Sequence, residues 1–98
     1  MEEQQYNQGK ARAHIWISGQ VQGVFFRDAT HRKAEDLHIT GWVRNLPDSR
    51  VEAIFEGDKE VVSKIIDWTK EGPDTARIEE VKVKWEKYKD EFDSFQIR

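Results

Sequence analysis

The sequence predicts an α+β sandwich in which two helices cover one face of an antiparallel sheet. Several short segments alternate apolar and polar residues, as strands with one buried face do. Two other segments repeat apolar residues at helical spacing. The 98 residues, 37% of them hydrophobic, suffice for one domain with a modest core. The elements follow one another in the order βαββαβ, which is that of the split βαβ, or ferredoxin-like, sandwich.

The first strand and first helix flank a glycine-containing loop. Residues 11–18 alternate, with Ala11, Ala13, Ile15 and Ile17 on one face, which predicts a strand with one buried face. After the loop, apolar residues recur at helical spacing on one side of a predicted amphipathic helix, namely Phe26, Thr30, Ala34 and Leu37.

The middle of the chain predicts two strands joined by a tight turn. The segment 40–46 places Gly41, Val43 and Asn45 on one side, and 51–56 turns its apolar residues inward. Between them, Pro47-Asp48-Ser49-Arg50 has the composition of a turn.

The last third predicts a second helix and a long strand. Asp58 is a suitable N-cap, an apolar stripe runs from Val61 to Trp68, and Gly72-Pro73 ends the helix. The segment 78–87 alternates as a strand, and 92–97 can add a short extra one. We expect residues 1–10, which are polar, to form a flexible N-terminal tail, and residues 11–98 to form the domain.

Charge and composition disfavour several classes of partner. Charged residues make up 36% of the chain, the net charge is −3, and both signs are interspersed, so we expect no nucleic acid and no membrane surface as a partner. The chain has no cysteine, which removes disulfides, thiol nucleophiles and zinc–thiolate sites. We expect a cytoplasmic monomer without a cofactor. We also expect no metal site, because the three histidines lack ligand spacing.

The segment 19–27, GQVQGVFFR, is the most informative in the chain. Glycines between a strand and a helix let consecutive amides point at one spot, which is how proteins bind anions. Arg27 then falls in the first helical turn, where the helix dipole disfavours a cation unless an anion joins it. The loop therefore predicts a phosphate or carboxylate site with its own guanidinium.

The predicted topology brings Asn45 to the same end of the sheet. The first and second strands run parallel with the third between them, so their carboxyl ends share one sheet edge. Two strand spacings, roughly 10 Å, then separate the loop from Asn45. A small anion and one water would bridge that gap.

These segments resemble the signatures of the acylphosphatase family. The resemblance rests on GQVQGVFFR at 19–27, GWVRN at 41–45 and the segment 51–57, and it covers about residues 11–98. It implies a small metal-independent enzyme that hydrolyses the carboxyl–phosphate bond of acyl phosphates to carboxylate and inorganic phosphate. It also implies that Arg27 holds the phosphoryl group, that Asn45 orients the attacking water, and that the remaining phosphate contacts are backbone amides of Gln20, Val21, Gln22, Gly23 and Val24.

The chemistry of the residues agrees with these roles. An acyl phosphate needs no strong nucleophile, since its leaving group is a weak base, so positioning and charge stabilisation remain. A guanidinium gives two parallel hydrogen bonds and stays charged. An asparagine amide accepts from water or donates to phosphate, but it is no general base.

Two positions depart from the family pattern. Ser49 in the turn and His38 at the helix end stand where the family usually has glycine. If both keep a positive φ, each costs about 1 kcal/mol. This concerns stability rather than the chemistry.

Two other functions stay open at this point. An RNA-binding module shares the topology, but the predicted third strand, VEAIFE, is acidic where RNA needs cations. A phosphate-binding domain without turnover is the second, since similar domains occur in larger carbamoyl-transferring proteins. We expect a freestanding hydrolase, because the sequence carries no partner domain.

Other side chains have plainer interpretations. We interpret Phe25 and Phe26 as core and loop anchors. The many carboxylates lie on predicted outer faces, which disfavours a glycosidase-like pair. Whether Trp16, Trp42 and Trp85 form an aromatic platform on the open sheet face depends on strand alignment.

Overall fold

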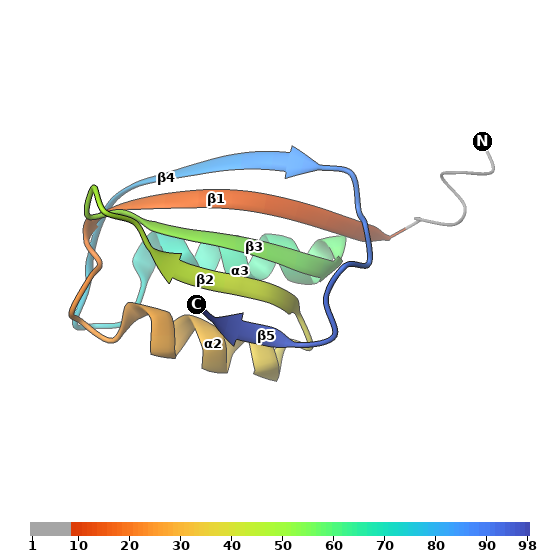
Figure 1. Ribbon diagram of the computed structural model, residues 1–98, viewed down its shortest axis with the longest axis horizontal. Coiled ribbons are helices and arrows are strands. Elements are labelled where there is room, and N and C mark those ends of the chain that lie inside the picture. Colours follow the sequence, from red (N-terminus) through yellow and green to blue (C-terminus); the bar gives the residue numbers. More distant parts are fainter. Residues whose placement is uncertain (1–8) are drawn as a thin grey trace.

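The computed structural model describes residues 9–98, in which two helices pack on a five-stranded sheet, as predicted (Figure 1). The predicted tail, residues 1–10, falls mostly outside the described residues. In chain order, the elements are β1 (Lys10–Gln20), α2 (Phe26–Asp36), β2 (Thr40–Asn45), β3 (Val51–Asp58), α3 (Lys59–Glu71), β4 (Arg77–Glu86) and β5 (Phe95–Ile97).

The strand order β4-β1-β3-β2-β5 places β3 between β1 and β2. All neighbouring pairs are antiparallel except β2 and β5, which run parallel. The predicted arrangement of the first three strands is confirmed, and so is the short extra strand. The carboxyl ends of β1 and β2 therefore lie at the same edge of the sheet.

The core lies between one sheet face and the helices. In β1 every second residue, from Ala13 to Ile17, is fully buried, as the alternation predicts. Helix α3 contacts β1, β3 and β4, while α2 contacts β2 and β5. Figure 1 shows α3 behind β1 and β3. This division of the sheet leaves the other face free of helices.

The open face carries buried charges, which the sequence did not predict. Glu52 and Glu56 of β3 do point away from the helices, yet they are 7% and 1% exposed. They belong to a charge network that joins β1, β2, β3, β4 and the segment after β4. Its members are Arg12, His14, Arg44, Glu52, Glu56, Glu86 and Glu91.

The aromatic residues of the open face stack around His14. The His14 ring lies 4.0 Å from that of Trp16 and 6.3 Å from that of Trp42, centroid to centroid. Trp85 does not join them, because it pairs with Ala13 and shares the helix side of the sheet. The open-face platform therefore contains two of the three tryptophans considered.

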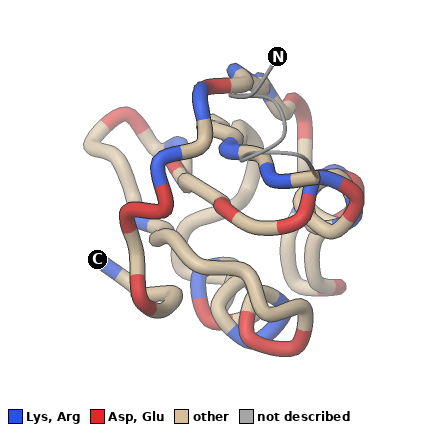
Figure 2. Tube along the Cα trace, turned by 90° about the vertical axis from the view of Figure 1, so that its right-hand side faces the viewer, with Lys and Arg blue, Asp and Glu red and all other residues tan. Residues whose placement is uncertain are grey.

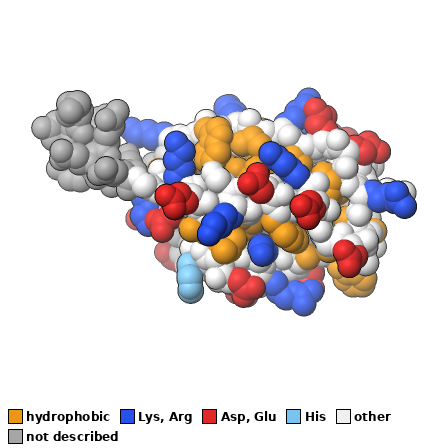
Figure 3. Space-filling view, turned by 180° about the vertical axis from the view of Figure 1, so that it is seen from behind, with side chains coloured by type: hydrophobic (Ala, Val, Ile, Leu, Met, Phe, Trp, Pro, Cys, Tyr) orange, Lys and Arg blue, Asp and Glu red, His pale blue; other side chains and the backbone are white. Residues whose placement is uncertain are grey.

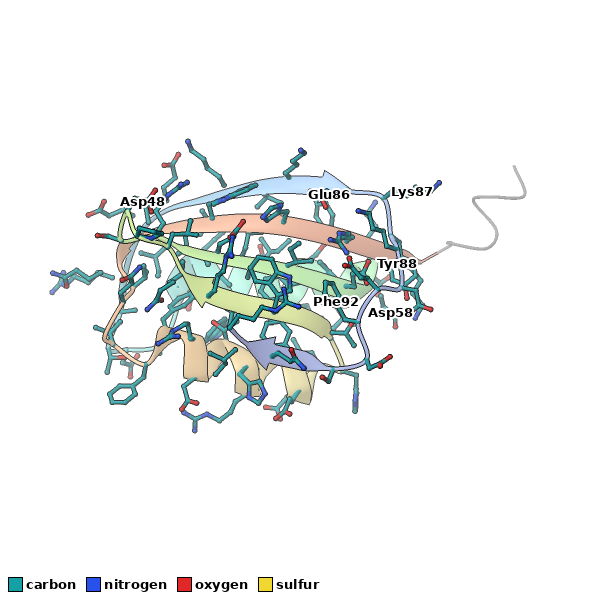
Figure 4. The ribbon with its side chains drawn as sticks, viewed as in Figure 1. Asp48, Asp58, Glu86, Lys87, Tyr88 and Phe92 are labelled. Atoms are coloured by element: carbon teal, nitrogen blue, oxygen red, sulfur yellow. The ribbon has the colours of Figure 1, made fainter. Side chains whose placement is uncertain are left out.

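Both unusual non-glycine positions keep a positive φ. His38 has φ 57° and Ser49 has φ 81°, so each residue occupies the left-handed region that favours glycine. Hydrogen bonds hold the turn around Ser49, since Asp48 accepts from the Arg50 amide at 3.2 Å and its Nε at 2.9 Å. The arginine lowers the pKa of Asp48, first by this side-chain hydrogen bond. Figure 4 labels Asp48 in this turn.

Charges of both signs alternate along the trace, as Figure 2 shows. On the helix side, apolar patches appear between charged side chains (Figure 3). Val83 and Trp85 of the edge strand β4 are 37% and 49% exposed there. No helix within residues 9–98 is long and apolar enough to cross a membrane.

Candidate active site

The loop between β1 and α2 is anchored by its apolar side chains. Val21 is 1% exposed in the core, and Val24 packs against the same core cluster. Gly23 between them has φ 75°, and no atom lies within 4 Å of the point that a Cβ would occupy. With the two valine side chains turned inward, the backbone of the loop lies at the surface.

Two side-chain hydrogen bonds fasten this loop to its neighbours. The Gln22 amide Nε2 donates to the carbonyl oxygens of Leu46, at 2.8 Å, and Arg50, at 2.9 Å. On the other side, Thr75 Oγ1 donates to the Val24 carbonyl at 2.6 Å. The loop is thereby fixed to the turn between β2 and β3 and to the connection after α3.

The loop carries free backbone donors in the part of the chain that the structure describes. Within residues 9–98, the amides of residues 21–28 have no backbone or side-chain acceptor, and the first that does is Ala29, which donates to the Phe25 carbonyl at 3.0 Å. Gln20 is the last residue of β1, opposite Arg77, and its amide lies at the strand end. A loop with free donors at the N-terminus of an 11-residue helix suits an anion.

Arg27 lies in a pocket beside these donors. The pocket has a volume of about 340 Å³ and is lined by loop residues, the start of α2 and Ile97 of β5. In the described part of the chain, Arg27 makes no ion pair, whereas Asp28 pairs with Arg32 at 3.3 Å. The guanidinium is thus available to a ligand, near a helix end that itself attracts anions.

Asn45 is the last residue of β2 and faces the helix side of the sheet with Val43. Ile97 of the Arg27 pocket pairs with Val43, two residues before Asn45. The next residue, Leu46, accepts the hydrogen bond from Gln22. The loop, Arg27 and Asn45 therefore gather at one end of the sheet (Figure 1), although Asn45 is not among the residues that line the Arg27 pocket.

The side-chain oxygen of Asn45 is buried and has no hydrogen-bond partner among the described residues. An unpaired buried acceptor is costly, by about 1–3 kcal/mol, so such atoms usually have a bound partner or a functional role. This amide is therefore a candidate functional group at this end of the sheet.

Sequence reasoning missed two features of this end of the molecule. Phe26 is a core anchor at 1% exposure, but Phe25 is not, since its side chain is 73% exposed. The apolar stripe of the predicted helix begins at Phe26 and leaves Phe25 outside it. Nothing in the sequence marks the left-handed backbone of Phe25, φ 64°, which is unusual for a bulky residue. The side chain of Gln22 fastens the loop, a role that its position next to Gly23 does not reveal.

Comparisons with known proteins agree on one family. A model of the acylphosphatase family, described as "Acylphosphatase", matches residues 13–97. A curated acylphosphatase from Pelotomaculum thermopropionicum is 48% identical over 88 residues, which are 90% of this chain and 96% of the relative.

Solved structures give the same result. A structure of an acylphosphatase from Coxiella burnetii superimposes with a TM-score of 0.88 at 34% identity and covers 100% of both chains. Full-length HypF, in a phosphate- and nucleotide-bound form, superimposes with a TM-score of 0.79 at 28% identity. That match covers 91% of this chain and 12% of HypF.

Proposed function

This chain belongs to the acylphosphatase family and hydrolyses acyl phosphates, and from that premise we propose how its own residues carry the reaction. Backbone amides of residues 20–24 and the guanidinium of Arg27 bind the phosphoryl group. Asn45 orients the water that attacks phosphorus. The products are a carboxylate and inorganic phosphate.

The observation that carries this proposal is the run of amides without protein acceptors between β1 and α2. Free backbone donors held in place are worth most where negative charge gathers, as on the oxygens of a transferring phosphoryl group. The bonds from Gln22 and Thr75 support the assignment, since they fix the loop without using its amides. The site therefore needs little rearrangement when the anion binds.

Arg27 supplies the charge that the amides lack. A planar guanidinium donates two parallel hydrogen bonds to phosphoryl oxygens and remains protonated at any physiological pH. Its lack of an ion-pair partner within residues 9–98 supports this role, because a structural arginine usually pairs with a carboxylate.

Asn45 fits the positioning of water better than proton transfer. A side-chain amide can accept a hydrogen bond from the water or donate one to a phosphoryl oxygen, and it is not a base at neutral pH. The carboxylate leaves as a weak base and needs no protonation, so no general acid is required. Both protons of the attacking water stay with the inorganic phosphate, and the step balances without a protein base. No step of this mechanism uses a metal ion.

The test of the phosphoryl site is Arg27→Gln. We expect kcat/KM for benzoyl phosphate to fall by about 10³-fold, with an unchanged circular dichroism spectrum. The control is Lys64→Gln, which removes an exposed cation of α3 that does not line the pocket and should alter turnover less than about twofold. Near-full activity of Arg27→Gln contradicts the assignment.

The test of the water site is Asn45→Ala. We expect kcat to fall by about 10²-fold while competitive inhibition by inorganic phosphate stays within a factor of about three, because water positioning matters only for the chemical step. An equal loss of turnover and of phosphate inhibition would reassign Asn45 to anion binding. Both measurements are made with and without a chelator, which should change neither.

A further inference from the structure

The pocket that contains Arg27 has an apolar side formed by two exposed side chains. Four large hydrophobic residues in the described range are exposed, namely Phe25 at 73%, Ile97 at 43%, Val83 and Trp85. Val83 and Trp85 lie on the edge strand β4. Phe25 and Ile97 come from opposite ends of the domain sequence, yet both line the pocket beside Arg27.

The position of Phe25 does not contribute to the stability of the fold. Its backbone has φ 64° and ψ 21°, a left-handed conformation that costs a bulky residue of order 1–3 kcal/mol. At 73% exposure, its ring contributes little to the core in return. Strained residues of this kind cluster where a side chain contacts a ligand.

We propose that Phe25 and Ile97 bind the acyl group of the substrate and make this enzyme prefer acyl phosphates with a neutral aryl or long alkyl group. The inference rests on the proposed binding of the phosphoryl group by the loop and Arg27. With the phosphoryl group held there, the carbon chain across the anhydride oxygen extends along the pocket. An apolar group then gains by covering the two exposed side chains, whereas an acetyl group is too short to cover both.

A negative charge at the pocket disfavours acyl groups that carry a carboxylate. Asp28 lines the same pocket, and its carboxylate is 58% exposed with one partner, Arg32, at 3.3 Å. A second carboxylate on the substrate would approach this like charge and would lose water on an apolar surface. Acyl phosphates of dicarboxylic acids are therefore expected to be poor substrates.

The contacts of the acyl group with Phe25 and Ile97 should change mainly KM. The acyl carbon chain does not change charge during the reaction, so its contacts stabilise the ground state and the transition state alike. Burying part of a phenyl ring corresponds to about a tenfold change in affinity.

The experiment compares benzoyl, acetyl and succinyl phosphate as substrates of the wild type and of Phe25→Gly, which also relieves the backbone strain. We expect the wild type to prefer benzoyl phosphate, with succinyl phosphate poorest. In Phe25→Gly, KM for benzoyl phosphate should rise about tenfold, while KM for acetyl phosphate changes less than threefold. Ile97→Ser should show the same pattern more weakly, so that loop flexibility in the glycine variant is not the cause.

The matched control is Trp85→Ser, which removes an apolar side chain on β4 that is 49% exposed, close to the 43% of Ile97, and should leave the ratio of the two KM values unchanged. An unchanged ratio in both Phe25→Gly and Ile97→Ser overturns the inference. Inhibition by inorganic phosphate separates the two proposals. If Phe25→Gly and the wild type are inhibited equally while Arg27→Gln is not, the phosphoryl site stands whatever the acyl preference. Inhibition that persists in Arg27→Gln overturns the phosphoryl site instead.

Discussion

The loop end and the open face of this protein treat polar groups in opposite ways. At the loop end (residues 19–28 with the turn 45–50), the described amides of 21–28 and the Asn45 oxygen have no protein partner. In the charge network of the open face, Glu56 accepts three hydrogen bonds, from Arg12 at 3.2 Å and from the amides of Lys89 and Glu91 at 2.8 and 2.9 Å. Figure 4 places Asp48 at the first end and Glu86 and Phe92 toward the other.

The difference indicates that the loop end serves ligand binding and that the charge network serves the stability of the fold. Donors that already have a partner would have to break that bond to bind a ligand, so a binding site keeps them free. Buried charges without partners would unfold a small domain, so the network satisfies them. Changes in the network should therefore alter stability without turnover, and changes at the loop end should alter turnover first.

The largest effect on stability is expected from Glu56→Ala. It removes a carboxylate that is 1% exposed and leaves Arg12 and two amides short of an acceptor. We expect the free energy of unfolding, measured with urea, to fall by about 3 kcal/mol. Below the unfolding transition, kcat/KM for benzoyl phosphate should stay within about twofold of the wild type, since the site lies elsewhere.

The matched control is Lys10→Ala, which breaks the exposed ion pair with Asp58, 2.9 Å long with side chains 45% and 64% exposed. Such pairs contribute about 0–1 kcal/mol. A similar loss of unfolding free energy in both variants would mean that burial of the network charges does not increase their contribution to stability. A drop in turnover with Glu56→Ala would show that the two regions are not separable.

The next effect concerns pH. The hydrogen bond from Arg12 lowers the pKa of Glu86 below its ordinary 4.5, against a smaller effect of burial and with help from His14. Burial raises the pKa of Glu52, but bonds from His14 and Arg44 outweigh it, so this pKa also lies below 4.5.

A folded-state pKa below the unfolded value stabilises the fold above the unfolded value and loses that contribution as pH falls through the folded value. We expect the urea midpoint to fall as the pH drops below about 4.5, and Glu86→Gln to reduce this dependence on pH. Glu79→Gln, at an exposed carboxylate without an ion pair within residues 9–98, serves as the control. A dependence on pH that Glu86→Gln leaves unchanged would contradict the role of this carboxylate.

The smallest effects should come from two of the strained positions outside the network. Ser49→Gly and His38→Gly place glycine at φ 81° and 57°. Each should raise the free energy of unfolding by about 0.5–1 kcal/mol, since glycine adopts this conformation without strain but loses more chain entropy. Ser63→Gly, inside α3, should lower stability by about the same amount. If all three variants lose stability, the positive φ carries no strain to relieve.

The spacing of apolar residues and the glycine-containing loop predicted most of the fold and of the proposed site. The periods of 2 and 3.6 fixed the strands and helices to within a few residues, because burial of one face requires apolar residues at those spacings. The glycines of the loop and the neighbouring Arg27 marked the proposed anion site, since backbone freedom at a helix start is itself local. Asn45 followed from topology once the parallel relation of β1 and β2 was inferred.

The sequence by itself thus determined the element order, the buried faces and the end of the sheet where the loop, Arg27 and Asn45 gather. Only the tertiary structure decided that Glu52 and Glu56 are buried. It also decided that Trp85 lies on the helix side of the sheet and that Phe25 is exposed beside Ile97. The reason is that a charge is buried or solvated according to its partners, and these are distant in sequence: Arg12 and Glu91 meet across 79 positions. A single sequence encodes the spacing along each element, whereas such pairings exist only after the strands have aligned.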